Sequence, residues 1–592
     1  AKKGMDVVEK NWNAIDAGAT AYVKVDVPAA WAEAEDQPDT TVLEGKPELV
    51  KMVKNILLPI DKMDGDSLPV STFMDHVDGQ FELGASAYEK RGVAVTVPEW
   101  DADKCIQCNS CAFVCPHATI RPFALTEEEA AAAPAAAKIR PVKAGKGKGK
   151  YQYTMAVSPL DCMGCGVCVG VCPTKAITMV AQESQLDQQP VFNYMVAKVA
   201  PKEELLDLSV KGSQFKQPML EFSGSCAGCA ETSYARLITQ LFGDRMYISN
   251  ATGCSSIWGG PGATSPYCTD KNGHGPAWSN SLFEDNAEHG YGMYTAQKVI
   301  RENLAEKTHA LLAIDWTAAE LKEAAQKWLD TMEDGAANKE AAKAYIAALE
   351  ESICDGCDCD ACKLASEILS QKDYLSKKSV WIFGGDGWAY DIGFGGVDHV
   401  LAQNEDVNIF VFDTEVYSNT GGQASKASNI GQVAQFAAAG KETKKKSLAE
   451  IAMSYGYIYV AQVAMGANQA QTLKAIAEAE AYHGPSLIIG YAPCEMHSIK
   501  GGMMHCQEEM KKAVDCGYWN MFRFDPSKET GKFTLDSKQP KGGYQEFLMN
   551  EARYSRLTRE FPERANELFE RNEESAKARY EHLLKLVEMY KD

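Results

Sequence analysis

The sequence has no long apolar run and no excess of positive charge. No stretch of about eighteen or more residues is continuously apolar, so no membrane span is expected. The N-terminal residues AKKGMDVVEKNW lack the apolar core of an export signal. The formal net charge is −21, which argues against nucleic acid as the main partner. We therefore expect a cytoplasmic protein that engages neither nucleic acid nor a membrane.

The length of the chain predicts more than one domain. It has 592 residues, whereas single cores rarely grow beyond about 250–300 residues. Residues 1–45 show a helical pattern through about Ala17 and a short strand, Tyr22–Val27, but no core of their own. We interpret them as the tail of a domain that begins before residue 1, since the chain also starts without Met. Residues 46–98 look like a connector with a short helix, Pro47–Leu57, and a strand, Val93–Val97.

Nineteen cysteines are the most informative part of the composition. In a long chain without an export signal they indicate metal binding rather than disulfides. Two runs have the form CxxCxxCxxxCP, which is the bacterial two-cluster ferredoxin pattern, with the fourth cysteine of each run serving the other cluster. One [4Fe–4S] cluster is therefore predicted on Cys105, Cys108, Cys111 and Cys172, and a second on Cys162, Cys165, Cys168 and Cys115. A zinc site would instead require two CxxC pairs.

The segment between the two runs is low in complexity. Its residues AAAAPAAAKIRPVKAGKGKGK contain lysines that alternate with Gly or Ala: Lys143, Lys146, Lys148 and Lys150. A flexible surface insertion explains this composition. On an acidic protein the same lysines also fit a basic patch for an acidic electron carrier.

Two apolar runs end in polar residues and predict a β-α-β unit. Val380–Phe383 leads into Gly384-Gly385-Asp386-Gly387, and Ile409–Phe412 leads into Asp413-Thr414-Glu415, with room for a helix at Ile392–Gln403. In open parallel sheets, ligands bind at the carboxyl ends of the strands. Hard oxygen ligands and glycines there suit Mg²⁺ bridged to a diphosphate. A glycine-rich turn in an ordinary α/β domain is the alternative.

Four further cysteines predict a third cluster at the same edge. Cys226-x2-Cys229 precedes a helical pattern, while Cys254 and Cys494 each follow a predicted strand, Met246–Ser249 and Ser486–Tyr491. If these strands are parallel and share one sheet, Cys254 and Cys494 meet at the edge that carries Asp386 and Thr414. The alternative is a set of buried structural thiols.

Three other segments have less specific patterns. Asn272–Met293 is rich in Gly, Asn, His and aromatic residues and looks like an active-site loop, although neither His274 nor His289 is assigned a proton-transfer role. Residues 317–350 and 551–592 are strongly helical. Between them, CDGCDCDAC places four cysteines whose spacing suits zinc or a further cluster, or equally reactive thiols or disulfides: Cys354, Cys357, Cys359 and Cys362.

Taken together, the motifs resemble one enzyme family over essentially the whole chain. Both CxxCxxCxxxCP runs, SCAGCAET, NATGCSSIWGG, GGDGWAYDIGFGG, DTEVYSNTGGQ and YAPCEMH are similar to the C-terminal half of pyruvate:ferredoxin oxidoreductases. GDG followed by residues 388–413 and then Thr414 is the thiamine diphosphate motif, with Thr in place of its usual Asn. The resemblance implies an α/β thiamine-diphosphate-binding domain, a parallel sheet flanked by helices, plus an α+β ferredoxin-like domain of the bacterial 2[4Fe–4S] type.

The resemblance also assigns roles to single residues. It implies that Asp386, Thr414 and the backbone carbonyl of Val416 hold Mg²⁺, that Asn419 assists catalysis at the thiazolium, and that Asn11 contacts coenzyme A. Thiamine diphosphate would be lined by Gly385, Asp386, Gly387, Trp388, Thr414, Glu415, Val416, Tyr417, Ser418, Asn419, Glu231 and Cys254. The third cluster would be held by Cys226, Cys229, Cys254 and Cys494.

The domains implied are four. Residues 1–45 would be the C-terminal tail of a coenzyme A-binding domain, and residues 46–98 would be a connector. Residues 99–199 would form the ferredoxin-like domain. Residues 200–592 would form the domain that binds thiamine diphosphate, together with a third cluster and a C-terminal helix.

The activity implied is the oxidation of pyruvate with coenzyme A to acetyl-CoA and CO2, with electrons passing through three [4Fe–4S] clusters to ferredoxin or flavodoxin. The glutamate that activates thiamine and the groups that grip pyruvate lie in the N-terminal half of the family, so this chain alone should be inactive and the complete enzyme a homodimer. Another 2-oxoacid as substrate, an electron-transfer subunit without its own chemistry, and an interaction module are the rival interpretations.

Overall fold

The computed structural model describes residues 5–34, 43–143, 145, 148–315, 317–354, 357 and 359–592. The chain divides into two units, residues up to Val50 and residues from Lys51 onward. The first unit contains α1 (Met5–Gly18), as predicted, and the 3₁₀ turn η1 (Ala29–Glu33). The predicted strand Tyr22–Val27 is wrong, because these residues form no strand and Val23 is 83% exposed. Their alternating pattern fits a strand, but no neighbouring strand pairs with them in the described residues of the chain.

Short helical segments lie at the boundary between the two units and directly after it. α2 (Pro47–Met52), the π-turn η2 (Val53–Leu57) and α3 (Leu58–Asp61) confirm the predicted helix Pro47–Leu57. Three 3₁₀ turns follow: η3 (Gly65–Ser67), η4 (Val70–His76) and η5 (Ala85–Tyr88). The strand predicted at Val93–Val97 forms slightly later, as β1 (Thr96–Trp100).

The two cysteine runs are folded around two small sheets. β1 pairs antiparallel with β5 (Ile177–Ala181), and β4 (Gln152–Val157) lies between β2 (Ile120–Leu125) and β3 (Arg140–Pro141). The helices here are α4 (Ser110–Val114), α5 (Glu127–Ala131), α6 (Val167–Gly170) and α7 (Gln188–Lys198), with the turns η6 (Gln182–Gln185) and η7 (Glu203–Leu205). The low-complexity segment therefore contains regular structure, namely the last two residues of α5 and all of β3. Its Lys146 lies outside the described residues.

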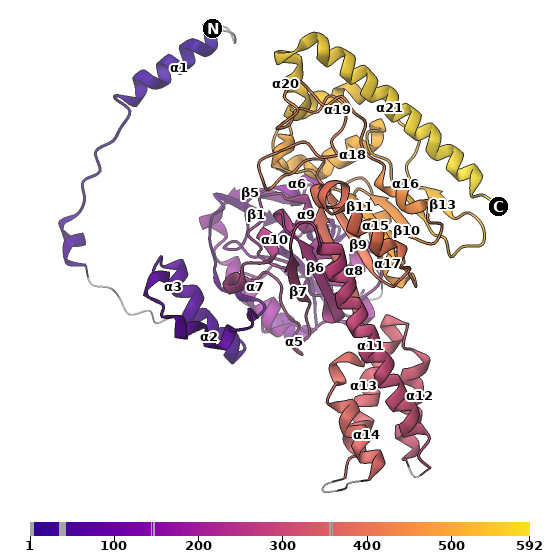
Figure 1. Ribbon diagram of the computed structural model, residues 1–592. Coiled ribbons are helices and arrows are strands. Elements are labelled where there is room, and N and C mark those ends of the chain that lie inside the picture. Colours follow the sequence, from indigo (N-terminus) through magenta and orange to yellow (C-terminus); the bar gives the residue numbers. More distant parts are fainter. Residues whose placement is uncertain are drawn as a thin grey trace. The chain divides into compact units, whose positions relative to one another are not determined.

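An eight-stranded, mostly parallel sheet forms the larger part of the unit (Figure 1). The strand order is β13-β12-β10-β11-β9-β8-β6-β7, and only β12 and β13 run antiparallel to their neighbours. The strands are β6 (Met246–Ala251), β7 (Ala277–Ser281), β8 (Ser379–Gly385), β9 (Asn408–Asp413), β10 (Tyr459–Val463), β11 (Ser486–Tyr491), β12 (Phe522–Phe524) and β13 (Phe533–Leu535). All four strands predicted for this region are present and mutually parallel.

Helices flank this sheet and share one core with it. They are α8 (Val210–Ser213), α9 (Ala230–Phe242), α10 (Cys254–Gly259), α11 (Asn286–Leu312), α15 (Phe394–Ala402), α16 (Leu448–Met453), α17 (Gln469–Ala481), α18 (Cys506–Cys516) and α19 (Tyr544–Asn550). Short turns connect them: η8 (Gly243–Arg245), η9 (Gly262–Thr264), η10 (Lys372–Tyr374), η11 (Gly387–Ile392), η12 (Glu495–His497) and η13 (Met503–His505). The predicted C-terminal helix consists of α20 (Ala552–Glu560) and α21 (Pro562–Met589), separated at Pro562.

The ferredoxin-like region packs directly on the sheet domain. Phe113, Val114 and Val167 of α4 and α6 belong to the same core as the large sheet. Ser233 Oγ on α9 donates to the Val114 carbonyl at 2.9 Å, and Arg236 donates to the Phe113 carbonyl. The predicted cluster ligands Cys111 on α4 and Cys168 on α6 are therefore held against the domain of the large sheet by buried apolar and polar contacts.

The segment Asn272–Met293 is mostly regular structure, so its prediction as a loop was wrong. It contains β7 and the start of α11. β7 is an edge strand and carries few large apolar residues, so its sequence lacks the apolar run by which buried strands are predicted. Gly290 on α11 serves helix–sheet packing rather than a loop, because a Cβ there would lie 2.5 Å from the Ile382 side chain of β8.

Four helices form a small bundle that extends from the sheet domain in Figure 1. α11 is joined there by α12 (Ala319–Asp330), α13 (Gly335–Ser352) and α14 (Asp360–Leu369). The helix predicted over 317–350 is thus two helices, α12 and α13. The bundle has its own hydrophobic core, which includes Trp328, Tyr345 and Ile368. None of the helices in the described part of the chain combines the length and the apolar composition of a bilayer span.

Candidate functional site at the edge of the sheet

Four neighbouring strands deliver the predicted ligands to one edge. Asp386 follows β8, Thr414 follows β9 and Cys254 follows β6, while Cys494 stands three residues beyond Tyr491, the last residue of β11. The order β11-β9-β8-β6 is parallel throughout, so the four carboxyl ends lie side by side. The predicted convergence of these residues on one sheet edge is confirmed.

The oxygens of Asp386, Thr414 and Val416 are spaced as ligands of one small cation. Thr414 Oγ1 lies 2.9 Å from Asp386 Oδ1 and 2.9 Å from the Val416 carbonyl oxygen. Adjacent ligands of octahedral Mg²⁺, with bonds of about 2.0–2.1 Å, stand about 2.9 Å apart. The three groups therefore offer a hard-oxygen set with the right spacing for Mg²⁺, which supports their predicted role.

The electrostatics of Asp386 also favour a bound cation. Burial, and then the nearby Asp413 carboxylate, raises the pKa of Asp386 to about 7. Its Oδ2 accepts a hydrogen bond from Ser425 Oγ, and its Oδ1 accepts a second from the Thr414 backbone N–H at 3.1 Å. A divalent cation beside the carboxylate would stabilise its ionised form.

A buried ion-pair network holds the loop that carries Thr414. Glu415 adopts a left-handed backbone with φ 59°, and its carboxylate accepts from Arg553 at 2.8 Å and from Lys445 at 2.9 Å. Burial would raise the pKa of Glu415, but Lys445 and Arg553 outweigh it and hold that pKa at about 2. His497 Nε2 donates to the Thr414 carbonyl at 2.7 Å. The Glu415 carboxylate is thus occupied, and its carbonyl accepts from Ser428 Oγ at 2.6 Å and from Gln432 at 2.9 Å, so its contact with thiamine diphosphate stays a prediction.

The residues that hold this loop, Lys445, Arg553 and His497, were not predicted from the sequence. Lys445 stands in the run KETKKKS, which has the composition of a solvated surface, and Arg553 stands in the strongly helical segment 551–592. Arg553 lies 138 residues from Glu415 in the chain, and no local sequence pattern predicts an ion pair between residues so far apart. His497 belongs to the motif YAPCEMH, and that was the one available signal.

The glycine turn after β8 is packed against two aromatic rings. A Cβ at Gly384 would lie 2.3 Å from the Trp388 ring, and one at Gly387 would lie 2.7 Å from the Tyr417 ring. Trp388 is fully buried. The predicted contribution of Trp388 to a ligand would therefore come from its backbone, as would that of Gly385 and Gly387.

Ser418 connects the oxygen set to the third cysteine set. Its Oγ lies 2.8 Å from Thr414 Oγ1 and 3.5 Å from Cys494 Sγ. A cluster on Cys494 would thus lie beside the predicted Mg²⁺ ligands. Asn419, the next residue, is exposed on the same loop, and its catalytic role stays a prediction.

The third cysteine set surrounds a buried carboxylate. Burial raises the pKa of Cys254 above its usual range, and so does the negative charge of four nearby groups: Glu231, Cys229, Cys494 and Cys226. The four predicted ligands are thus close together, although Cys226 itself is exposed. Burial raises the pKa of Glu231 to about 7, opposed by the Trp258 indole N–H, which donates to the carboxylate at 3.0 Å.

The two ferredoxin-type sets line two cavities of nearly equal size. One cavity of about 20 Å³ is lined by Cys105, Cys108, Cys111 and Cys172, and one of about 20 Å³ by Cys115, Cys162, Cys165 and Cys168. Each set thus combines three cysteines of one run with the fourth of the other, as the pattern predicted. Burial raises the pKa of Cys168, as do the other three thiols of its set and Cys111 of the neighbouring set.

The spacing of these thiols argues against single metal ions. A tetrahedral zinc ion with bonds of about 2.3 Å holds its sulfurs about 3.8 Å apart. Among the described residues, no three of the twelve cysteines in the three sets bring their Sγ atoms within 4.8 Å of one another. A cubane binds each cysteine to a different iron and so needs wider spacing.

His117 lies between the second and the third set. It follows Cys115-Pro116, and burial lowers its pKa to about 4 against the opposing effect of the adjacent Cys226 backbone. Its carbonyl accepts from the Phe222 N–H at 3.0 Å. The set that contains Cys115 is therefore the ferredoxin-type set in contact with the segment of the third set.

The remaining predicted residues lie elsewhere. Asn11 is exposed on α1 in the first unit, so its contact with coenzyme A stays a prediction. Lys143 donates to the Cys105 carbonyl, and Lys150 pairs with Glu204. His289 is packed against Ser249 of β6 at 2.8 Å, and His274 is exposed, so neither approaches the predicted ligands.

Three family models match separate parts of the chain. Residues 104–176 match a 4Fe-4S dicluster domain, and residues 362–489 match the C-terminal TPP binding domain of thiamine pyrophosphate enzymes. Residues 35–94 match a domain of unknown function. The predicted fold class, with a thiamine-diphosphate-binding parallel sheet and a two-cluster iron–sulfur domain, is confirmed.

Curated relatives match along almost the entire chain. It is 49% identical to a pyruvate-flavodoxin oxidoreductase of Klebsiella pneumoniae, over 99% of this chain and 49% of the relative. It is 50% identical to a pyruvate:ferredoxin oxidoreductase of Moorella thermoacetica, over 99% of this chain and 50% of the relative. A mitochondrial pyruvate dehydrogenase [NADP(+)] of Euglena gracilis is 44% identical, over 99% of this chain and 32% of the relative.

The chain spans about half the length of the first two of these relatives. The resemblance predicted from the motifs is confirmed over this span. Among solved structures, a 2-oxoglutarate:ferredoxin oxidoreductase of Magnetococcus marinus aligns at 14% identity and a TM-score of 0.25, over 46% of this chain and 65% of the other.

Proposed function

We propose that this chain is the part of a pyruvate:ferredoxin or pyruvate:flavodoxin oxidoreductase that binds the diphosphate end of thiamine diphosphate and carries the electrons away. The complete reaction converts pyruvate, coenzyme A and two oxidised one-electron carriers into acetyl-CoA, CO2, a proton and two reduced carriers. One observation carries the proposal: Ser418 Oγ touches both Thr414 Oγ1, at 2.8 Å, and Cys494 Sγ, at 3.5 Å. The proposed Mg²⁺–diphosphate ligands and the third cysteine set would thus meet where the loop after β9 contacts Cys494.

The residues of this chain would bind and orient the cofactor. Thiamine diphosphate, when bound, supplies the electron sink for decarboxylation of a 2-oxoacid. Its Mg²⁺ would be held by Asp386, Thr414 and the Val416 carbonyl. His497 orients the Thr414 backbone through a hydrogen bond to the Thr414 carbonyl. The backbone of the glycine turn at Gly385–Gly387 would face the diphosphate. Neutral Glu231 is available as a hydrogen-bond donor near Cys254, since its pKa is raised to about 7.

Three [4Fe–4S] clusters would carry the electrons one at a time. The cluster on Cys254 and its partners would be nearest to thiamine, because Ser418 joins Cys494 to the oxygen set. The cluster on the set that contains Cys115 would be the second in the chain of electron transfer, because His117, two residues after Cys115, lies beside the Cys226 backbone. The Cys105 set would come last, where Ile106 is exposed and Lys143 contacts the Cys105 carbonyl. Ferredoxin or flavodoxin would accept the electrons at that surface.

The exposed side chains around the site support the proposal that another part of the enzyme covers it. Large apolar side chains are exposed around the carboxyl edge of the sheet: Ile257 on α10, Leu282 after β7, Ile392 at the end of η11 and Phe436. Phe436 is 93% exposed in a loop whose Gln435 N–H bonds to the Gly422 carbonyl. Clustered exposed apolar groups mark an interaction surface. We propose that the rest of the enzyme covers this rim and supplies the thiamine-activating glutamate, the pyruvate-binding groups and the coenzyme A-binding domain to which residues 1–45 belong.

Reconstitution tests the proposal. The chain loaded with Mg²⁺, thiamine diphosphate and clusters should bind the cofactor but not oxidise pyruvate, and addition of the other half should restore pyruvate-dependent reduction of ferredoxin. Asp386→Asn should lower thiamine diphosphate affinity in Mg²⁺ about 100-fold, because one charged Mg²⁺ ligand is lost. Asp398→Asn, which lies on α15 and outside the oxygen set, is the matched control.

Three results would contradict it. Pyruvate oxidation by the chain alone would remove the need for a second half. Absence of bound thiamine diphosphate would indicate an electron-transfer subunit. Activity of the reconstituted enzyme with 2-oxobutyrate or an arylpyruvate but not with pyruvate would assign another substrate.

A further inference from the structure

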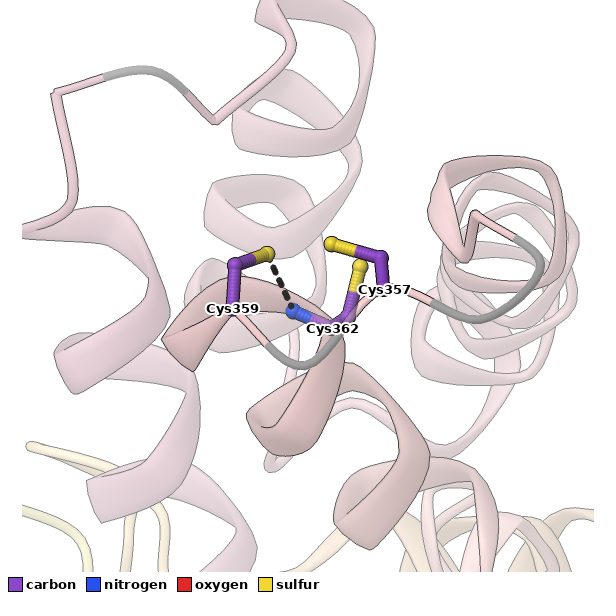
Figure 2. Close-up of side chains that lie close together, drawn as sticks. All are labelled: Cys357, Cys359 and Cys362. Carbon is purple, nitrogen blue, oxygen red and sulfur yellow. Dashed lines mark hydrogen bonds between the residues drawn. The ribbon is translucent and has the colours of Figure 1, made fainter.

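We propose that the junction of α13 and α14 binds one structural zinc ion through the thiolates of Cys357, Cys359 and Cys362. Figure 2 shows these three side chains turned toward one another at the start of α14. Their Sγ atoms all lie within 4.8 Å of one another. The junction belongs to the helical bundle, away from the sheet edge that carries the proposed cofactor sites, so this metal is separate from the three clusters.

The thiols are held in place by the local backbone. Cys359 is the N-cap of α14, and its Sγ accepts from the Cys362 N–H at 3.4 Å. The Cys357 N–H donates to the Cys354 carbonyl at 3.2 Å, which closes the turn between the first two cysteines. Cys362 is buried on the first turn of the helix. In the sequence, the cysteines form two C-x2-C pairs separated by one residue, a spacing typical of zinc ligands.

The spacing of the thiols favours a single ion over a cluster. Zinc holds thiolates about 3.8 Å apart, so closure from within 4.8 Å requires only small side-chain rotations. The twelve cysteines of the three cluster sets do not gather so closely, as expected if each binds a different iron of a cubane. Within one chain, the two kinds of cysteine group are therefore distinguished by their geometry.

The spacing also argues against a disulfide as the purpose of the group. A disulfide joins two thiols and would leave the third of the three unpaired beside it. Cys354, three positions before Cys357, is exposed and is not among the thiols that lie within 4.8 Å of one another, so its Sγ would have to move toward them to supply a fourth ligand. Binding would convert the thiols to thiolates and release one proton from each, so that affinity rises with pH. The positive end of α14 at Cys359 partly offsets the charge of the thiolates.

The proposed ion would fasten the tip of the bundle. The core of the bundle includes Leu349 near the end of α13 and Ala365 on α14, and the cysteines lie between them in the chain. Coordination would tie the start of α14 to the end of α13, as metals do in small domains whose cores are limited. The metal would take no part in electron transfer.

Metal analysis of the anaerobically purified, cluster-loaded chain tests the proposal. About one zinc per chain is expected in addition to the iron. Cys357→Ser and Cys362→Ser should each lower zinc about 10-fold or more while iron and thiamine diphosphate binding stay unchanged. Cys516→Ser, a buried cysteine on α18 outside all four groups, should keep the zinc. Cys354→Ser should weaken binding if Cys354 is the fourth ligand, and an unchanged zinc affinity would remove it from the site.

Cobalt substitution of the unmutated chain gives a second, independent measurement. Exchange of the zinc for Co²⁺ should produce the visible absorption of tetrahedral thiolate-bound cobalt, which does not depend on whether a variant folds. Less than about 0.1 zinc per chain after incubation with equimolar Zn²⁺ would overturn the proposal. So would a disulfide among the three cysteines in the purified holoprotein, or a loss of iron in Cys357→Ser with normal zinc.

Discussion

A single hydroxyl group, on Thr414, organises the candidate site at the scale of residues. It lies 2.9 Å from two prospective Mg²⁺ ligands and 2.8 Å from Ser418 Oγ. An Asn at this position, as in the usual thiamine motif, could supply an oxygen to the metal but no hydroxyl proton to share with Ser418. The Thr therefore couples the metal site to the loop that contacts Cys494.

Ser418→Ala should lower the reduction potential of the cluster nearest to thiamine. The Ser418 hydroxyl lies 3.5 Å from Cys494 Sγ, and a hydrogen bond to a cluster thiolate stabilises the reduced, more negative state. A shift on the order of tens of millivolts is expected in a spectroelectrochemical titration. Ser418→Thr keeps the hydroxyl and should keep the potential. Equal potentials for Ser418→Ala and the unmutated chain would show that no such bond forms.

Glu509→Gln should stabilise the protein at pH 8 and have little effect below about pH 4.5. Burial, followed by the nearby Glu551, raises the pKa of Glu509 from 4.5 to about 7. Because this carboxyl is more basic in the folded state, its favourable contribution is complete below pH 4.5 and is lost as pH rises toward 7. The loss is on the order of 3 kcal/mol. Urea unfolding at both pH values measures it.

The neighbouring Glu508 provides the control for this prediction. Glu508 is about half exposed, and hydrogen bonds from Lys512 and His505 lower its pKa. Glu508→Gln should therefore not stabilise the protein at pH 8. A Glu509→Gln variant with the same midpoint as the unmutated chain at pH 8 would contradict the prediction.

At this scale, local motifs revealed the ligands but not their supports. The interval from Asp386 to Thr414 spans one β-α-β unit, and the sequence encodes it locally. The pairs that hold the loop, Glu415 with Arg553 and Thr414 with His497, join residues that are 138 and 83 positions apart. Buried charges are identified by their partners, and partners so distant in the chain appear only once it is folded.

At the scale of elements, regular buried strands were predictable and the elements near the edge of the sheet were not. β8, β9, β6 and β11 have apolar runs that any fold must bury, and all four were predicted. β7 has the burial pattern of an exposed edge and lacks such a run. The predicted strand at Tyr22–Val27 has the right alternation but no neighbour. Strand formation thus depends on a partner that sequence alone does not supply.

Trp328→Ala should loosen the helical bundle without affecting the cofactor sites. Trp328 is fully buried in the core of the bundle, and its indole N–H donates to the Leu375 carbonyl at 2.8 Å. The cavity should cost about 3–5 kcal/mol. Hydrogen exchange should accelerate in α12, α13 and α14 but not in β8 or β9. The exposed Glu323→Ala on α12 is the control, and equal acceleration in the sheet would show that the bundle is not a separate cooperative unit.

At the scale of the whole molecule, the net charge is negative, whereas a positive side chain lies beside the cysteine set that we propose as the electron exit. The chain carries a net charge of −21, while Lys143 contacts the carbonyl of Cys105 in the outermost cysteine set. A local positive group would orient an acidic carrier that the overall charge repels. The lysines that the sequence analysis singled out thus have a location that fits this role.

Lys143→Glu should lower kcat/KM for an acidic ferredoxin about 10-fold in the reconstituted enzyme, with less effect at high salt because the attraction is screened. Stopped-flow measurement of carrier reduction at several ionic strengths tests this. Lys585→Glu on α21 carries the same charge change outside the ferredoxin-like region and should leave the rate unchanged. Equal rates for both variants would place the carrier elsewhere.

The exposed position of Cys226 has a practical consequence for oxygen tolerance. Dioxygen, peroxide and chelators attack exposed thiolates and clusters before buried ones. Cys229 and Cys494 are shielded by the protein, but Cys226 opens the third set to solvent in this half of the enzyme. Air should therefore destroy this cluster first in the isolated chain, and assembly with the covering half should protect it. In the proposed complete enzyme, the covering part would then also protect this cluster against oxidative damage.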